Sequence, residues 1–81
     1  MNIRRILAAN LRRHRRAAGL SQEGLAFECG LHRTYISGVE RGARNPTVVV
    51  LAKIADALNI GPAALLKHDE VSAPDGDGRR S

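Results

Sequence analysis

The chain has 81 residues, enough for one small domain, and 43% of them are hydrophobic, although only Phe27 and Tyr35 are aromatic. Its lone cysteine, Cys29, excludes an internal disulfide and a CxxC-type zinc site, and no apolar stretch reaches the roughly 18 residues that a membrane helix needs. The formal net charge is +5, and the absence of a signal-peptide pattern leads us to expect a cytoplasmic protein.

The positive charge is concentrated in the first half of the chain. Residues 1–44 hold nine arginines and three glutamates, whereas acidic and basic residues nearly balance over residues 45–81. The guanidinium group of an arginine can bind a phosphate through two N–H groups at once. A half of the chain that is rich in arginine is therefore typical of nucleic-acid-binding proteins. Charge alone leaves a second interpretation equally open, a solvated basic surface without a ligand.

Apolar residues spaced by three and four predict a first helix over residues 3–18, which Gly19 ends in a left-handed conformation. His14 lies on the apolar stripe of this helix, and we interpret it as a partly buried packing residue because no second metal ligand lies nearby. Ser21 predicts the N-cap of a second helix over Gln22–Cys29, with a glycine directly after it.

A third helix is predicted over His32–Glu40, with two apolar residues inward and a polar outer side made of Arg33, Thr34, Ser37, Gly38 and Arg41. Thr47 predicts the N-cap of a fourth helix that runs to Leu58. Gly61 is expected to cap a short fifth helix, with Pro62 in its first position. We therefore expect an all-α domain of five helices over residues 1–68.

The last segment, residues 69–81, is rich in Ser, Pro, Gly, Asp and Arg. It has almost no apolar residues to bury, so the composition predicts a disordered tail.

The second and third helices are separated only by a short turn at Gly30-Leu31, and the small Ala26 stands where they must pack closely. This spacing predicts a helix-turn-helix, in which the first helix spans the DNA backbone and the second enters the major groove. A generic pair of antiparallel helices would satisfy the same spacing.

A set of longer motifs separates these alternatives. They are Leu20-Ser21-Gln22-Glu23, Leu25-Ala26, Gly30-Leu31, Arg33-Thr34-Tyr35-Ile36-Ser37, Glu40-Arg41-Gly42 and Arg44-Asn45-Pro46. Together they resemble the XRE family over roughly residues 3–66, and within it they are most similar to restriction–modification controller proteins. The resemblance implies a five-helix lambda repressor-like DNA-binding domain with a helix-turn-helix. It also implies a transcription regulator that acts as a homodimer, binds upstream of its own gene and controls restriction–modification genes.

The same resemblance implies which side chains contact DNA. Arg33 and Thr34 are expected to contact base edges, where an arginine can bind guanine O6 and N7 bidentately. His32 and Ser37 border them and are expected to contact a base, or alternatively a phosphate. A surface salt bridge is the alternative role of Arg33. Contacts with phosphate are expected from Gln22, Tyr35, Arg44 and Asn45. Arg44 could also read bases in the minor or major groove, and Tyr35 could instead lie half-buried at the edge of the core.

Two further groups of residues complete the expected organisation. Arg15 and Glu40 match an ion pair between the first and third helices, whereas Arg5, Arg12, Arg13 and Arg16 are expected to be solvated. Surplus apolar residues near the C-terminal helices are the candidate dimer interface: Val48, Val49, Ile60, Leu65 and Leu66. They could alternatively close the core.

Nothing in the sequence indicates catalysis. The carboxylates form no spaced pair with a histidine, and no nucleophile elbow, phosphate loop or metal signature occurs. We therefore expect no enzyme, no metal, no cofactor, no small-molecule ligand and no membrane partner. The expected partners are double-stranded DNA, with a pseudo-palindromic operator, and a second copy of the chain. The alternative function is a protein-interaction module of the antitoxin type on the same fold.

Overall fold

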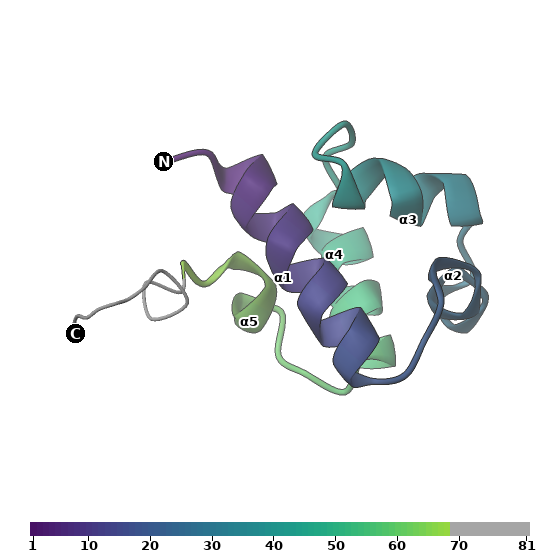
Figure 1. Cartoon of the computed structure of the whole chain (residues 1–81). Helices are drawn as coiled ribbons and strands as arrows, with labels where there is room; N and C mark the ends of the chain where they lie inside the picture. The colour runs from purple at the N-terminus through teal and green to yellow at the C-terminus, as the bar shows by residue number, and fades with distance from the viewer. Residues whose placement is uncertain (69–81) are drawn as a thin grey trace.

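The computed structural model describes residues 1–68, which form five α-helices joined by short loops (Figure 1). The helices are α1 (Ile3–Ala17), α2 (Gln22–Cys29), α3 (Arg33–Glu40), α4 (Val48–Ala57) and α5 (Ala63–Leu66). No strand occurs within these residues, so the prediction of an all-α fold with five helices is confirmed. None of the helices in this part of the chain is long and apolar enough to span a membrane. The tail predicted over residues 69–81 lies outside the described residues.

Side-chain caps mark the starts of α1, α2 and α4, and the Asn2 side chain caps α1 by accepting a hydrogen bond from the Arg5 N–H at 3.3 Å. The Ser21 hydroxyl accepts a hydrogen bond from the Gly24 N–H at 2.8 Å, and the Thr47 hydroxyl accepts one from the Val50 N–H at 3.1 Å. Each bond satisfies a backbone donor that the first turn of a helix leaves without a partner. The predicted N-caps of α2 and α4 are therefore confirmed.

Four helix ends differ from the prediction by one residue, and one of them is the end of α4, which stops at Ala57 with Leu58 as its C-cap. α1 ends at Ala17, with Ala18 as its C-cap. His32 is the N-cap of α3 rather than its first residue, because its backbone is extended. Pro62 is likewise the N-cap of α5, so that helix begins at Ala63 and Gly61 does not cap it. Cap residues are half inside a helix, which makes these positions the hardest to assign from a sequence.

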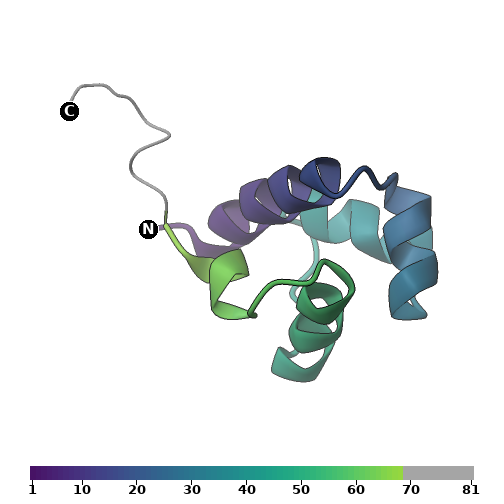
Figure 2. The same ribbon diagram turned by 90° about the horizontal axis from the view of Figure 1, so that it is seen from below.

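All five helices contribute to one hydrophobic core. α1 packs against α3 and α5, and α2 packs against α3 and α4 (Figures 1 and 2). The buried apolar residues are Leu7, Leu11, Leu25, Ala26, Ile36, Val39, Leu51, Ile54, Ala55, Leu58 and Leu65. The apolar stripe of α1 does not extend to its start, since Ile3 is exposed, whereas His14 is partly buried as expected.

A buried asparagine on α1 holds the short α5 in place. Asn10 Nδ2 donates hydrogen bonds to the carbonyl oxygens of Leu65 at 3.0 Å and Lys67 at 2.8 Å. This contact seats the Leu65 side chain in the core with 0% of its surface exposed. Leu65 therefore closes the core, and its inclusion in the candidate dimer interface was wrong, because it has no surface to offer a partner.

Candidate nucleic-acid interface

The connection between α2 and α3 is a tight turn. Gly30 adopts the left-handed conformation, with φ of 71°, and the Leu31 N–H donates to the Ala26 carbonyl oxygen at 2.8 Å. Leu25, Ala26 and Ile36 are buried in the same core, so the two helices pack on each other through their inner sides. α3 consequently turns its other side to solvent along an edge of the molecule (Figure 1).

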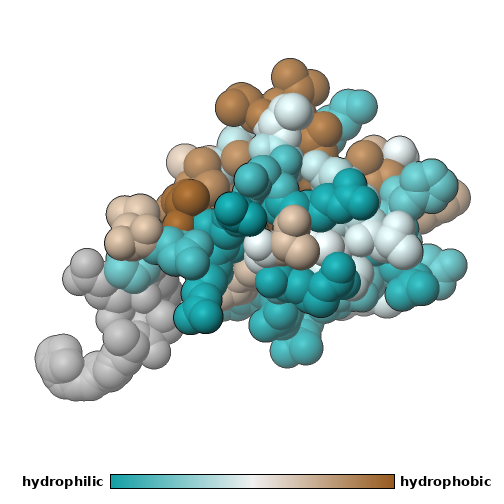
Figure 3. Space-filling model, turned by 90° about the horizontal axis from the view of Figure 1, so that it is seen from above, coloured by the Kyte–Doolittle hydropathy of each residue, from teal (hydrophilic) through white to brown (hydrophobic). Residues whose placement is uncertain are grey.

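The outer side of α3 is polar. His32, Arg33 and Thr34 are exposed at its N-terminal end, and Ser37 is half-exposed one turn later. Arg33 makes no hydrogen bond or ion pair with any other part of residues 1–68, so the alternative of a surface salt bridge finds no support there. Figure 3 shows hydrophilic side chains across the middle and lower part of the face seen from above, with hydrophobic side chains gathered mainly at its upper and left edges.

Arg41 belongs to this polar side but was absent from the predicted contacts. It is the exposed C-cap of α3, and its Nη1 donates to the Ser37 hydroxyl at 2.6 Å. The i, i+4 spacing of Ser37 and Arg41 was the signal in the sequence that could have linked them. The bond orients a hydroxyl group that was predicted to contact a base.

Gly38 was predicted on the exposed outer side of α3, but it is not exposed there. It is buried, because the Arg44 side chain lies across it: a Cβ atom added at residue 38 would be 2.6 Å from Arg44 Cγ. The Arg44 guanidinium carbon then lies 5.6 Å from the centre of the Tyr35 ring, within the range of a cation–π contact. Tyr35 is half-buried and Arg44 is exposed, so these two predicted phosphate contacts are adjacent, with Asn45 exposed beside Arg44.

Glu40 is the centre of a buried polar cluster. Its carboxylate accepts hydrogen bonds from Arg15 Nε at 2.6 Å and Arg15 Nη2 at 3.1 Å, and the exposed fractions of the two residues are 2% and 8%. The ion pair between α1 and α3 is therefore present in the structure. Arg12, which was expected to be solvated, instead donates from Nη2 to the Glu40 carbonyl oxygen at 2.9 Å. α1 thus holds the C-terminal end of α3 at two points.

Gln22 joins the same cluster from the start of α2. Its Nε2 donates to Glu40 Oε1 at 3.0 Å. The side-chain amide of Gln22, which was predicted to contact phosphate, is therefore held in place by the Glu40 carboxylate. Burial raises the pKa of Glu40, but hydrogen bonds from Arg15 and Gln22 and the charges of Arg15 and Arg12 outweigh it and hold the pKa below its usual range. The cluster stays ionised at neutral pH.

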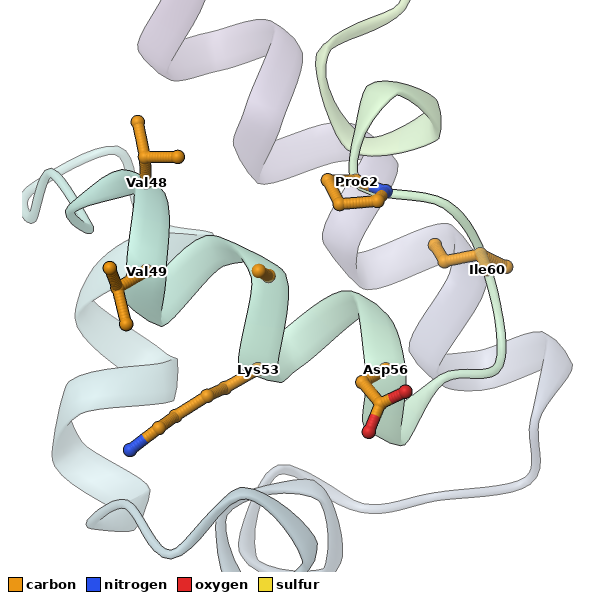
Figure 4. A pocket seen from close by; sticks show the side chains of 7 residues that line it. Val48, Val49, Lys53, Asp56, Ile60 and Pro62 are labelled. Carbon is orange, nitrogen blue, oxygen red and sulfur yellow. The ribbon is translucent and has the colours of Figure 1, made fainter.

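A second surface, on the far side of the core from α1, is apolar and shallow. Val48 and Val49 are 82% and 68% exposed at the start of α4. They line a groove of about 610 Å³ together with Ala52, Lys53, Asp56, Ile60 and Pro62 (Figure 4). Leu66, the remaining predicted interface residue, is exposed on α5. Ile60 is half-buried against the core, so it contributes to both the core and the groove.

Residues 1–68 contain no group of three or more His, Cys, Asp or Glu side chains arranged to bind a metal ion. Cys29 is partly buried, and burial together with the neighbouring Glu28 carboxylate raises the pKa of its thiol. A raised pKa keeps a thiol protonated and unreactive.

The fold and the polar outer side of α3 define a helix-turn-helix protein. The family model described as "Helix-turn-helix" matches residues 11–65, and the chain belongs to this family. It is 48% identical over 66 residues to Control protein C.BamHI of Bacillus amyloliquefaciens, which covers 80% of this chain and 82% of that protein. It is 52% identical over 66 residues to Control protein C.SmaI of Serratia marcescens, with 82% and 79% covered.

Solved structures agree with this assignment. The restriction-modification controller protein C.AhdI from Aeromonas hydrophila superimposes with a TM-score of 0.74 and 50% identity, over 76% of this chain and 90% of that one. The hypothetical transcription factor NHTF from Neisseria superimposes with a TM-score of 0.78 and 45% identity, over 80% and 75%. The resemblance to XRE-type regulators is confirmed, and the chain is a DNA-binding transcription regulator.

Proposed function

We propose that this regulator binds a pseudo-palindromic operator upstream of its own gene as a homodimer and controls restriction–modification genes. The observation that carries the proposal is Arg33, an exposed arginine at the start of α3 that makes no hydrogen bond or ion pair within residues 1–68. An arginine in that place in a recognition helix can bind guanine O6 and N7 bidentately, while Thr34 borders it and His32 and Ser37 lie on either side.

Phosphate contacts would then fix the orientation of α3 in the groove. Gln22 is positioned for this role at the N-terminus of α2, where backbone N–H groups and the helix dipole attract anions. Tyr35 on α3, with Arg44 and Asn45 in the loop after α3, would supply a second set of contacts. Contacts of this kind set position and salt dependence, whereas Arg33 sets sequence preference.

A homodimer supplies the specificity that one helix lacks. A single recognition helix reads only a few base pairs, while two related by a twofold axis read half-sites about 10 base pairs apart. The groove beside Val48 and Val49 is the candidate interface, and Lys53 and Asp56 give it charges of opposite sign. In a twofold interface each contact occurs twice, so a contact between Lys53 of one copy and Asp56 of the other would form two equivalent ion pairs.

Control of restriction–modification genes is supported by similarity to C.AhdI, a restriction-modification controller protein, and to the control proteins C.BamHI and C.SmaI. We infer that this chain, too, acts by binding rather than by catalysis.

The test is fluorescence anisotropy with the duplex from upstream of the gene, beside an unrelated duplex of equal length. We expect the wild type to prefer the upstream duplex, and Arg33→Ala to weaken that binding by about 5- to 150-fold, the range for loss of one bidentate base contact. Binding to the unrelated duplex should change little.

Arg16→Ala is the matched control. It removes the same charge from an exposed position on α1, outside the helix-turn-helix. An equal loss of upstream binding in both variants would show that only charge matters and would contradict base contact by Arg33. A wild type that binds both duplexes weakly and equally would overturn autoregulation.

A further inference from the structure

Gly38 lies in the middle of α3, where a glycine is unfavourable. Glycine in a helix interior lowers stability by about 0.5–1 kcal/mol relative to alanine. Its backbone does not require glycine, because residue 38 is absent from the positive-φ positions of residues 1–68. The reason for a glycine here must therefore be the space that a side chain would fill.

That space is occupied by Arg44. A Cβ atom at residue 38 would be 2.6 Å from Arg44 Cγ and 3.6 Å from both Cβ and Cδ of the same side chain. Real Cβ atoms essentially never approach another atom as closely as 2.6 Å, so even a methyl group would displace the arginine. The aliphatic part of Arg44 thus lies in a notch on the surface of α3 that exists because residue 38 has no side chain.

Two further contacts restrain Arg44 once it lies in the notch. The backbone N–H groups of Ala43 and Arg44 both donate to the Gly38 carbonyl oxygen, at 2.8 Å and 3.2 Å. At the other end of the side chain, the guanidinium lies over the Tyr35 ring, one turn nearer the start of α3. A long side chain that is already restrained loses less conformational entropy when it binds a ligand.

We propose that Gly38 is a positioning residue for DNA binding. By lacking a side chain, it lets Arg44 lie across α3 and hold its guanidinium on Tyr35, beside the helix that carries Arg33 and Thr34. Gly38 touches no DNA itself and acts only through Arg44. The proposal rests on the proposed function, in that DNA is the ligand of Arg44.

The experiment is a double-mutant cycle of Gly38→Ala and Arg44→Ala. Binding to the upstream duplex is measured by anisotropy, and the Tyr35 ring is observed by NMR without DNA. Tyr35 is the only tyrosine and the chain has no tryptophan, so its ring signals are assigned directly. Thermal unfolding is recorded for each variant.

We expect Gly38→Ala to stay folded, with an unchanged or higher melting temperature, because alanine favours the helix and Arg44 can swing into solvent. Its Tyr35 ring signals should shift toward those of Arg44→Ala. Its affinity for the upstream duplex should fall by about tenfold, a factor comparable to that for Arg44→Ala. The double variant should bind no more weakly than Arg44→Ala alone.

Several outcomes would overturn the proposal while leaving DNA binding by the protein intact. These are full affinity in either single variant, unchanged Tyr35 signals in Gly38→Ala, or additive losses in the double variant. Unfolding of Gly38→Ala would also overturn it, since the notch would then serve the core rather than Arg44. A wild type without preference for the upstream duplex would instead contradict the proposed function, and the NMR comparison would still decide whether Gly38 positions Arg44.

Discussion

Glu40 shows how one buried carboxylate can organise several parts of this protein. Removing a charge from water is unfavourable, and here the loss is offset by two hydrogen bonds from Arg15 and one from Gln22. The three residues come from α3, α1 and α2. The hydrogen bonds among these residues therefore link the orientation of α3, the recognition helix, to the position of Gln22, the residue expected to contact phosphate.

Replacing this carboxylate tests its structural role. Glu40→Gln keeps the shape but leaves the Arg15 guanidinium buried without a counter-charge, so we expect the free energy of unfolding at pH 7 to fall by about 3 kcal/mol. Urea unfolding measures the change. Glu28→Gln, at an exposed position on α2, is the control and should change stability by about 0.5 kcal/mol or less.

The pH dependence of the same pair follows from the lowered pKa of Glu40. The ion pair contributes its full stabilisation above the ordinary glutamate value of 4.5, and this contribution is lost as the pH falls through the lower pKa of the folded state. The difference in stability between the wild type and Glu40→Gln should therefore shrink on acidification below pH 4.5. A difference that stays constant down to pH 2 would contradict the ionised pair.

At the scale of the elements, local signals predicted the helices well and their contacts poorly. The bounds of α2 agree with the prediction, Gln22–Cys29, because Ser21 and Gly30 act on backbone groups within a few residues. α5 has only four residues, too few for periodicity to show which side is buried, so Leu65 was assigned to the wrong surface.

The candidate site was predictable only to the level of which residues face outward. The positions of Arg33 and Thr34 follow from the periodicity of α3. The places of Arg12 and Arg44 do not, since each arginine crosses from its own segment to α3. Sequence spacing determines where a Cα atom lies on its helix. It does not determine which residues a long flexible side chain contacts, because those neighbours are brought together only by the tertiary structure.

The attachment of α5 to α1 depends on one amide. Asn10→Asp replaces the Nδ2 donor with an oxygen that repels the carbonyl oxygens of Leu65 and Lys67. We expect a loss of about 1–3 kcal/mol in stability, with faster hydrogen exchange in α5 than in α2 or α3. Asn45→Asp, at an exposed position, is the control for the added charge. Uniform loosening of all five helices would contradict a local role for Asn10.

At the scale of the whole molecule, polar and apolar surfaces are separated. Arg33 lies on the outer side of α3 and Arg44 lies across that helix at Gly38, while the exposed valines of α4 lie in a groove with Ile60 and Pro62 (Figure 4). Val48 and Val49 are not needed to close the core, which is complete within residues 1–68 from the other side chains of the five helices. Apolar side chains that are this exposed and adjacent favour an association surface.

Val49→Glu tests whether this groove joins two copies. A glutamate at a position that is largely exposed in the single chain should leave the fold intact, with a change in stability of about 0.5 kcal/mol or less in the monomer. In a dimer it would place two like charges in an apolar interface related by a twofold axis, so we expect sedimentation equilibrium to show dimers for the wild type and monomers for the variant. Phe27→Glu adds the same charge at an apolar residue of α2 that is even more exposed than Val49, and it should remain dimeric. Dimers in both variants would show that the interface does not lie on α4. A monomeric wild type would show that two copies associate only when DNA is bound.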